Sequence, residues 1–469
     1  MVIFMKRIIA IVIVGVLLLL GSKTAKCEEV EGQSEPVKPV ANYDTKETAV
    51  YTEDGIEADV LFEYTTPDGI CTIKVTEAYY DVTLDEENAT SYQAGLAYGK
   101  AISEVYPNYC TDLEPYIHEN IRYAFPNVKD DFSPVTTRLG SLYHSINGDY
   151  QQEIKGLSDG LGLKKRGIKK DGVLSVEEFL AGQLLPDALR QTACSGLSLW
   201  GEKTITGDML AVRCIEWQLG SDNTMCKIHS VLHLKNGEKS IASIGFLGLL
   251  EVISGINNDG VFGAILDVDT GQEYDFEGKT CYTYSLRKAL EEYNTAKDVG
   301  EYMVSNSDRF TYSHNIMITD GNESYCAEDA VLKIKEKGKG YSVLRDNKTP
   351  MMKDVKWESP DSFCIINSFV TENNYDIMSG FLPNVARFVK YNEWVKNTDK
   401  FNVVELKNTM TQEQVETDLY GSPVIYNVHK DDLTQMILID YHQGNVQVVF
   451  TGLDGVEDKP VFYQVEKFK

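Results

Sequence analysis

Three glycine turns, each next to strand-prone runs, are the strongest constraint on how the second half of the chain folds. Asn236-Gly237 separates IHSVLHL from SIASIGF, Asp320-Gly321 follows NIMIT, and Gln443-Gly444-Asn445 joins MILIDY to VQVVF. Short turns of this composition connect antiparallel neighbours in a sheet. From Thr206 onward we therefore predict mostly short strands, interrupted by one helical stretch over residues 285–302.

Helical periodicity dominates the preceding part of the chain. Apolar residues recur at helical spacing across residues 92–162, as in the series Leu113, Ile117, Ile121 and Phe125. Helices followed by antiparallel hairpins indicate an α+β layered fold rather than a Rossmann fold. We find no internal repeat and no interdomain linker after about Val60.

The N-terminus resembles a secretory signal peptide. Lys6 and Arg7 precede an apolar run from Ile8 to Leu20, and small residues follow it. The run is shorter than the roughly 20 residues that a membrane-spanning helix needs, although an uncleaved N-terminal membrane anchor stays open as an alternative. We assign residues 1–26 to the signal and residues 27–58 to a polar linker, and we expect a secreted or extracytoplasmic protein.

Charge and cysteine spacing exclude several classes of partner. The 469 residues carry 45 Lys and Arg against 71 Asp and Glu, a net charge of −26, which disfavours nucleic acid as a partner. The nine cysteines include no C-x-x-C pair, so neither a zinc ribbon nor a dithiol redox motif is indicated. We expect no metal and no cofactor.

One stretch has the appearance of half a calcium-binding loop. Asp171-Gly172 and the residues up to Glu178 match its second half, but the first and third positions would be Gly167 and Lys169, which offer no carboxylate. We interpret the stretch as a turn in which Ser175 caps a helix across Glu178.

Cys194 is the candidate nucleophile, although a single free cysteine is more often a small buried apolar residue. It lies in Ala193-Cys194-Ser195-Gly196, and Arg213-Cys214-Ile215-Glu216-Trp217 follows about twenty residues later. Further short motifs flank these two in a fixed order: Gly95 and Gly99, residues 153–163, Gly255-Ile256-Asn257-Asn258-Asp259-Gly260, Ser313-His314-Asn315, Ile366-Asn367-Ser368-Phe369, and Arg387.

This order resembles the cysteine-type N-terminal-nucleophile (Ntn) hydrolases of peptidase family C45, the acyl-CoA:6-aminopenicillanate acyltransferase group. Choloylglycine hydrolases and acid ceramidases are more distant relatives. The sequence departs from the family pattern at three positions. Cys214 and Glu216 replace Asn and Asp in R-N-x-D-W, and Ser368 replaces the His of T-N-H-F.

The resemblance implies a four-layer α/β/β/α Ntn-hydrolase sandwich. Residues 59–193 would form a mainly helical pro-segment and residues 194–469 the catalytic region. Family members cut themselves before the nucleophile, so the freed α-amine of Cys194 would act as its own base. A free α-amine has a pKa near 8, which suits a base at neutral pH.

The resemblance also assigns roles to four further residues. Arg213 would stabilise the thiolate, Glu216 would orient the new amine, Asn315 would donate to the oxyanion, and Arg387 would hold the substrate or the carboxylate. Arg213 and Glu216 are three positions apart, so on a regular strand they point to opposite faces, and a bend would be needed for them to converge.

We therefore expect a self-processing cysteine Ntn hydrolase that forms a thioester on Cys194 with a small acyl amide. The alternative is a non-catalytic extracellular binding protein that retains the fold, which the three departures would favour. A papain-like enzyme is disfavoured because Cys194-Ser195-Gly196 lacks the required helix start. The acyl group, the amine, the choice between hydrolysis and transfer, and the oligomeric state stay open.

Overall fold

The computed structural model describes residues 51–189, 193–268, 275–330, 342–353, 355–372, 374, 382–412, 414–417, 423–426, 433–455 and 459–468. These residues all belong to one unit that spans Ala49–Lys469. The predicted signal peptide and most of the predicted linker lie outside the described residues. Within the described ranges, no helix is both long and apolar enough to cross a bilayer.

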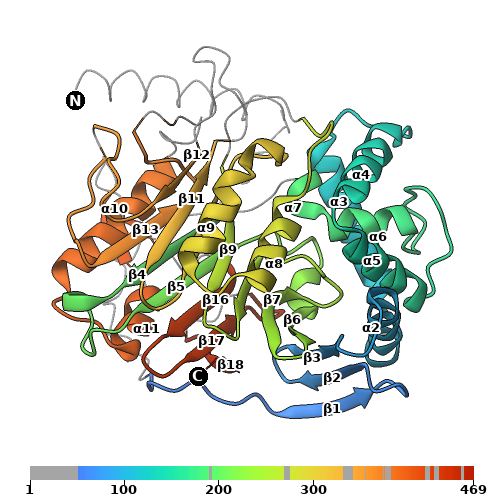
Figure 1. Cartoon of the computed structure of the whole chain (residues 1–469), viewed down its shortest axis with the longest axis horizontal. Helices are drawn as coiled ribbons and strands as arrows, with labels where there is room; N and C mark the ends of the chain where they lie inside the picture. The colour runs from blue at the N-terminus through green and yellow to red at the C-terminus, as the bar shows by residue number, and fades with distance from the viewer. Residues whose placement is uncertain are drawn as a thin grey trace, which may run out of the picture. The chain divides into compact units, whose positions relative to one another are not determined.

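Two β-sheets form the centre of this unit (Figure 1). The larger sheet has ten strands, in the order β1 (Val60–Thr65), β2 (Cys71–Thr76), β3 (Tyr80–Asp85), β6 (His229–Asn236), β7 (Lys239–Phe246), β8 (Ser254–Asn257), β9 (Phe262–Asp267), β10 (His314–Thr319), β11 (Ser324–Asp329) and β12 (Ser342–Arg345). The smaller sheet has six, in the order β13 (Ser362–Ile366), β4 (Ala193–Leu199), β5 (Leu210–Glu216), β16 (Leu433–Asp440), β17 (Asn445–Phe450) and β18 (Tyr463–Lys467). A separate hairpin pairs β14 (Gln414–Thr417) with β15 (Pro423–Tyr426).

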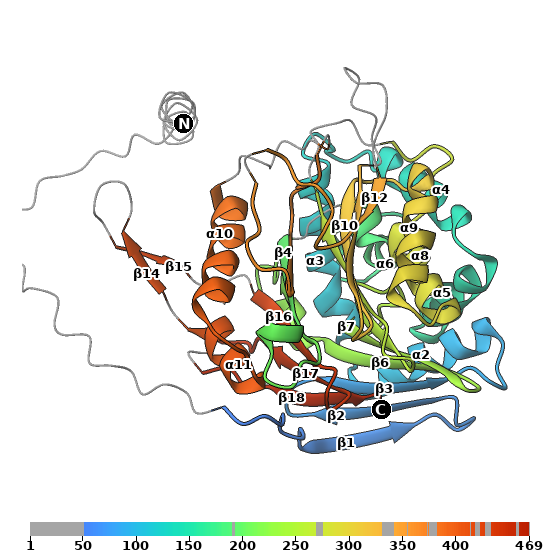
Figure 2. The same ribbon diagram turned by 60° about the vertical axis from the view of Figure 1, so that its left-hand side comes forward.

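Helices cover the outer face of each sheet, which gives four layers (Figure 2). Helices α8 (Tyr282–Glu292) and α9 (Ala296–Ser305) pack on the larger sheet. Helices α10 (Leu382–Asn397) and α11 (Val403–Thr411) pack through apolar side chains on the smaller one. The layering confirms the expected mixed α+β class.

A group of helices precedes the smaller sheet in the chain. It comprises α2 (Ser91–Val105), α3 (Tyr109–Ala124), α4 (Ser133–Ser145), α5 (Gly148–Gly160), α6 (Val176–Gln183) and α7 (Leu185–Ala188). The sequence analysis did not anticipate the three strands β1–β3 before them. Strand β3 pairs in parallel with β6, whereas every other described neighbour pair is antiparallel. The leading part of the chain therefore extends the larger sheet as well as supplying helices.

All three hairpin turns are confirmed. They connect β6 to β7, β10 to β11 and β16 to β17. The glycines Gly237, Gly321 and Gly444 have φ values of 64°, 85° and 68°, a region that favours glycine. The predicted helical stretch 285–302 is two helices, α8 and α9.

Two further sequence motifs have structural explanations. Gly95 and Gly99 on α2 face Gly156 and Gly160 on α5, and a Cβ atom at Gly95 would overlap the main-chain oxygen of Glu153. The small residues thus allow the two helix backbones to touch. Ser175 caps α6, and Glu178 completes the capping box, which confirms the predicted cap.

Candidate active site

Cys194 is the second residue of β4, between β5 and β13 in the smaller sheet. Because side chains alternate along a strand, Cys194 faces the larger sheet while Ser195 faces α10. The Ser195 hydroxyl is accordingly 2.9 Å from the hydroxyl of Tyr391 on that helix. The Cys194 side chain has no solvent-exposed surface in the uncleaved chain.

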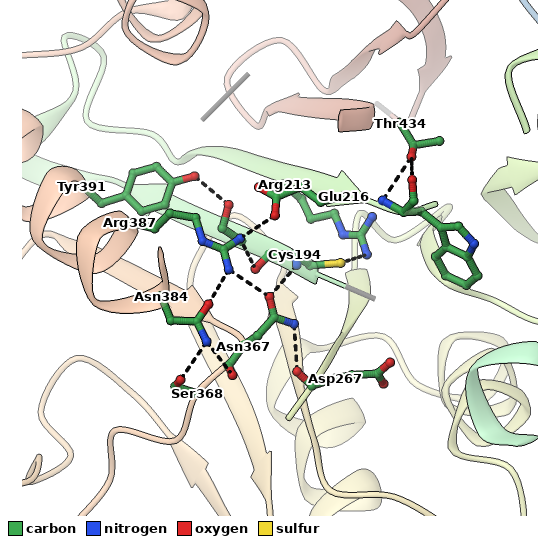
Figure 3. Close-up of polar contacts among 12 residues, drawn as sticks. Cys194, Arg213, Glu216, Asp267, Asn367, Ser368, Asn384, Arg387, Tyr391 and Thr434 are labelled. Atoms are coloured by element: carbon green, nitrogen blue, oxygen red, sulfur yellow. Dashed lines mark hydrogen bonds and ion pairs between the residues drawn. The ribbon is translucent and has the colours of Figure 1, made fainter. Parts of the chain in front are cut away.

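Arg213 is the side chain that contacts the thiol. On β5, its Nη2 donates to Cys194 Sγ at 3.2 Å and to the main-chain oxygen of Ile265 at 2.9 Å (Figure 3). Arg213 is fully buried, and its Nε and Nη1 have no hydrogen-bond partner among the described residues. Within the described ranges, Arg213 forms no ion pair with a carboxylate. Since an unpaired buried charge is costly, a thiolate at Cys194 would supply the counter-charge that this guanidinium lacks.

The thiol itself lies in a mixed electrostatic environment. Burial raises the pKa of the Cys194 thiol, and the charge of Arg213 opposes this effect. Glu216 and Asp267 raise the same pKa further. The resting thiol is therefore protonated near neutral pH, and its attack requires a base to accept the proton.

The main-chain atoms of Cys194 are held by two other side chains. Its N–H donates to Oδ1 of Asn367 at 2.5 Å, and its carbonyl oxygen accepts from Nη1 of Arg387 at 3.1 Å. Asn367 in turn donates to the main-chain oxygen of Asp267 at 2.8 Å. The nitrogen of the Ala193–Cys194 bond and the carbonyl that follows it are thus both fixed, by a side chain just after β13 and one from α10 (Figure 3).

Arg387 also connects Glu216 to this group. Its Nη1 donates to Glu216 Oε2 at 2.9 Å, and its Nη2 donates to Asn367 Oδ1 at 3.3 Å and to Asn384 Oδ1. Both partners of the ion pair are buried. Arg213 and Glu216 point to opposite faces of β5, as their spacing indicates. The two side chains therefore do not converge. Arg213 contacts the thiol, and Glu216 contacts Arg387 on the helix side of the sheet.

Asn315 lies next to this group, and among the described residues its side chain donates to Ile366 and Ser368 rather than to Cys194. It is on β10, opposite Glu328 in the hairpin register. Its Nδ2 donates to the main-chain oxygens of Ile366 at 2.9 Å and Ser368 at 3.1 Å. Both amide hydrogens are therefore used to hold the residues on either side of Asn367. The oxyanion role assigned to Asn315 by resemblance stays a prediction.

Sequence reasoning gave no site role to Asn367 or Asn384. Asn367 was noted within Ile366-Asn367-Ser368-Phe369, but a motif does not say which side-chain atom contacts the nucleophile. Asn384 precedes Arg387 by three positions on α10, a spacing that places two side chains on one helix face. That spacing was the available signal for Asn384.

The chain was also compared with known proteins. No family model matches the sequence, and no curated protein matches it. Solved structures give distant matches. A mutant of conjugated bile acid hydrolase from Clostridium perfringens is 15% identical, with a TM-score of 0.33, over 58% of this chain and 97% of that one.

Two further structures give matches of the same strength. The Caenorhabditis elegans ortholog of N-acylethanolamine-hydrolyzing acid amidase is 9% identical, with a TM-score of 0.33, over 52% of this chain and 92% of that one. Penicillin V acylase from Agrobacterium tumefaciens is 13% identical, with a TM-score of 0.32, over 55% and 83%. The chain is thus only distantly similar in structure to these three proteins.

Proposed function

We propose that the chain is the precursor of an exported cysteine-type Ntn hydrolase that cleaves the carbon–nitrogen amide bond of a small acyl amide. One observation carries the proposal. Three atoms of Cys194 are each held by a different side chain: Sγ by Arg213, N by Asn367 and O by Arg387. A cysteine that only fills a core does not need its thiol and its main-chain polar atoms to be held in this way.

The first proposed step is cleavage of the Ala193–Cys194 bond. Sγ attacks the Ala193 carbonyl carbon, the carbon–nitrogen bond breaks, and the thiol proton is transferred to the departing nitrogen. The product is a thioester between Ala193 and Cys194 Sγ, together with a free α-amine. Water then hydrolyses the thioester and restores the thiol. Asn367 Oδ1 supports this step because it already accepts from the nitrogen that becomes the amine.

The mature enzyme would repeat the same chemistry on an external amide. The α-amine takes the thiol proton, Sγ attacks the substrate carbonyl, and the amine product leaves with that proton. Water releases the acyl group from the thioester. A free α-amine has a pKa of about 8, so it accepts a proton at neutral pH without a histidine.

The remaining side chains would position these atoms. Arg213 would stabilise the thiolate, since its guanidinium has no carboxylate partner among the described residues. Arg387, held by Glu216 and Asn384, would keep the Cys194 carbonyl and Asn367 in place. Glu216 would influence the new amine through Arg387, with which it forms an ion pair.

A small, mostly apolar cavity lies beyond the end of β5, and none of the residues that hold Cys194 line it. Trp217 directly follows β5 on the face of Arg213, and its ring centroid is 6.1 Å from that of Phe246. Both side chains line a cavity of about 40 Å³ with Leu249 and Ile228. We favour hydrolysis over acyl transfer, because water is abundant outside the cell and acyl-CoA is scarce there.

Processing of the purified protein tests the proposal. The wild-type chain should give a C-terminal fragment whose N-terminal residue is Cys194, visible on a denaturing gel and identified by N-terminal sequencing. Cys194→Ala should leave one intact chain. Cys214→Ala is the matched control, because Cys214 is a buried neighbour that packs on the α10 side of the sheet.

The alternative is a binding protein with the same fold. Its support is the replacement of three family residues by Cys214, Glu216 and Ser368. An intact wild-type chain whose Cys194 does not react with iodoacetamide under native conditions, and which releases no amine from a panel of acyl amides, would favour that alternative.

A further inference from the structure

Three buried side chains meet between two helices of the leading part of the chain. Glu114 and His118 are one turn apart on α3, and Glu178 is in the first turn of α6. Their exposed fractions are 1%, 2% and 0%. His118 Nε2 is 2.8 Å from Glu178 Oε1 and 3.8 Å from Glu114 Oε1. One ligand atom from each residue therefore lies within 4.8 Å of the other two.

The loop before α6 fixes both carboxylates. The main-chain N–H groups of Lys169 and Ser175 donate to Glu178 Oε1 at 2.6 Å and Oε2 at 2.7 Å, and that of Gly172 donates to Glu114 Oε1 at 3.1 Å. A carboxylate oxygen that accepts one such hydrogen bond still has a second lone pair. Outer-shell hydrogen bonds of this kind orient metal ligands in characterised sites.

His118 is directed into the gap between the two carboxylates. Its Nδ1 has no hydrogen-bond partner among the described residues. The ring orientation therefore depends on what Nε2 contacts. At 3.8 Å, Glu114 is too far to share the proton that Nε2 donates to Glu178.

The group carries more negative than positive charge. Among the described residues, the ion pairs of Glu114 and Glu178 are with His118 alone. Two carboxylates and one imidazole give a net negative charge inside the protein whether the imidazole is neutral or protonated, which is unfavourable.

A zinc ion would remove this excess. One imidazole nitrogen and two carboxylate oxygens are ligands that Zn²⁺ accepts, at roughly 2.0–2.2 Å, which places neighbouring ligands about 3.3 Å apart. The observed separations of 2.8 and 3.8 Å bracket that value. Zn²⁺ with two carboxylates and a neutral imidazole sums to zero charge. Calcium is disfavoured because it takes about six to eight oxygen ligands.

We propose that Glu114, His118 and Glu178 form a structural Zn²⁺ site that fixes α6 and its preceding loop to α3. Binding replaces the proton on His118 Nε2 by the metal and releases that proton to solvent. The sequence analysis expected no metal from the cysteine spacing and the incomplete calcium loop. It did not consider these three residues, because Glu114 and His118 lie about sixty residues before Glu178 and no spacing pattern connects them. The site is independent of the proposed enzymatic function.

Metal binding to the full chain tests this site. We would use Cys194→Ala as the parent, so that neither self-cleavage nor the candidate nucleophile contributes. After chelation and dialysis, the parent should take up one equivalent of Zn²⁺ in calorimetry. Co²⁺ in its place should give visible d–d bands without the near-ultraviolet charge-transfer band of a thiolate ligand. This readout separates the site from the other cysteines.

Variants with a matched control assign the ligands. His118→Gln should weaken Zn²⁺ binding by more than about tenfold, since even outer-shell changes at metal sites have effects of roughly 10–100-fold. His144→Gln, which changes an exposed histidine on α4, should bind like the parent. If His118→Gln does not fold, the Glu114→Gln variant provides the test. Its amide oxygen can still accept the hydrogen bond from Gly172, so the loop keeps this contact. A parent that binds no zinc, or a Glu114→Gln protein that binds it as tightly, would overturn the proposal.

Discussion

The main-chain nitrogen of Cys194 donates its hydrogen to the side-chain oxygen of Asn367 at 2.5 Å. This nitrogen belongs to the peptide bond that we propose is cut, and a side chain from a distant part of the sequence holds it. Substitutions at Asn367 therefore test the proposed function as directly as substitutions at the thiol.

Replacing Asn367 should slow self-cleavage. We expect Asn367→Leu to reduce the rate by about 100-fold, the size of effect seen when one oriented hydrogen-bond group is removed from an active site. Asn367→Asp keeps an acceptor at Oδ1, so its cleavage rate should fall by less than that of Asn367→Leu. Quantified gels over time give the rates, and circular dichroism checks the fold. Cleavage of Asn367→Leu at the wild-type rate would exclude a role for this contact.

Arg213 should set the pH at which cleavage occurs. Burial raises the pKa of the Cys194 thiol and Arg213 lowers it, so removing the guanidinium should raise that pKa further. In Arg213→Met we expect the midpoint of the pH–rate profile for cleavage to move up by about 1–3 units. The midpoint for Arg213→Lys, which keeps the charge, should lie between those of Arg213→Met and the wild type. An unchanged profile in Arg213→Met would show that the contact does not affect reactivity.

The buried pair between Arg387 and Glu216 should contribute to stability in a way that depends on both partners. Removing one partner leaves an uncompensated buried charge, so Arg387→Met should lower the free energy of unfolding by about 3–5 kcal/mol. Combining it with Glu216→Leu should recover a large part of that loss. Urea titrations of the single and double variants, all made in Cys194→Ala, provide the comparison. Purely additive losses would contradict a coupled pair.

The contact between α2 and α5 should tolerate no side chain at Gly95. A Cβ there would meet the main-chain oxygen of Glu153, so Gly95→Ala should lower the melting temperature by several degrees. Gly140 on α4 is the matched control, because a Cβ at that position meets nothing within 4 Å. Gly140→Ala should be neutral or stabilising by up to about 1 kcal/mol. Equal effects of the two substitutions would contradict this explanation of the motif.

His233 should make the stability pH-dependent. It lies between Asp81 on the neighbouring strand β3, at 3.1 Å, and Glu466 on β18 of the other sheet, at 2.9 Å. Burial lowers the pKa of His233, but the two carboxylates outweigh burial and raise it to about 9. A raised pKa contributes stability that is fully present below the unfolded value of about 6.5 and is lost as the pH rises to about 9.

The measurement is the free energy of unfolding as a function of pH. The wild type should lose up to about 3 kcal/mol more than His233→Gln between about pH 6.5 and pH 9. Parallel curves for the two proteins would show that the pKa of this histidine is not raised in the folded state.

Local sequence signals predicted the fold where the determining contacts are close in the chain. The glycines Gly237, Gly321 and Gly444 identified their hairpins because a tight turn needs a positive φ. Ser175 and Glu178 identified a helix start because a capping box involves only four residues. Strands β1–β3 were missed although β2 pairs with both of its chain neighbours. The parallel pairing of β3 with β6 joins strands more than a hundred residues apart, and no local pattern reports a parallel neighbour.

In the candidate site, too, local spacing predicted some features and long-range packing determined the others. Strand alternation correctly placed Arg213 and Glu216 on opposite faces of β5. It could not show that Arg387 from α10 contacts Glu216, or that Asn315 uses its amide on Ile366 and Ser368. Those contacts depend on how the layers pack, and motif order does not encode side-chain hydrogen bonds.

The parallel pairing of β3 with β6 has a consequence for any attempt to make the protein without the residues before Cys194. A polypeptide that begins at Cys194 would leave β6 as an exposed edge strand, and its unpaired main-chain N–H and C=O groups could pair with a second molecule. Exposed edge strands of this kind promote aggregation. After the proposed cleavage, strands β1–β3 would therefore have to stay paired with β6 to keep this edge of the sheet covered.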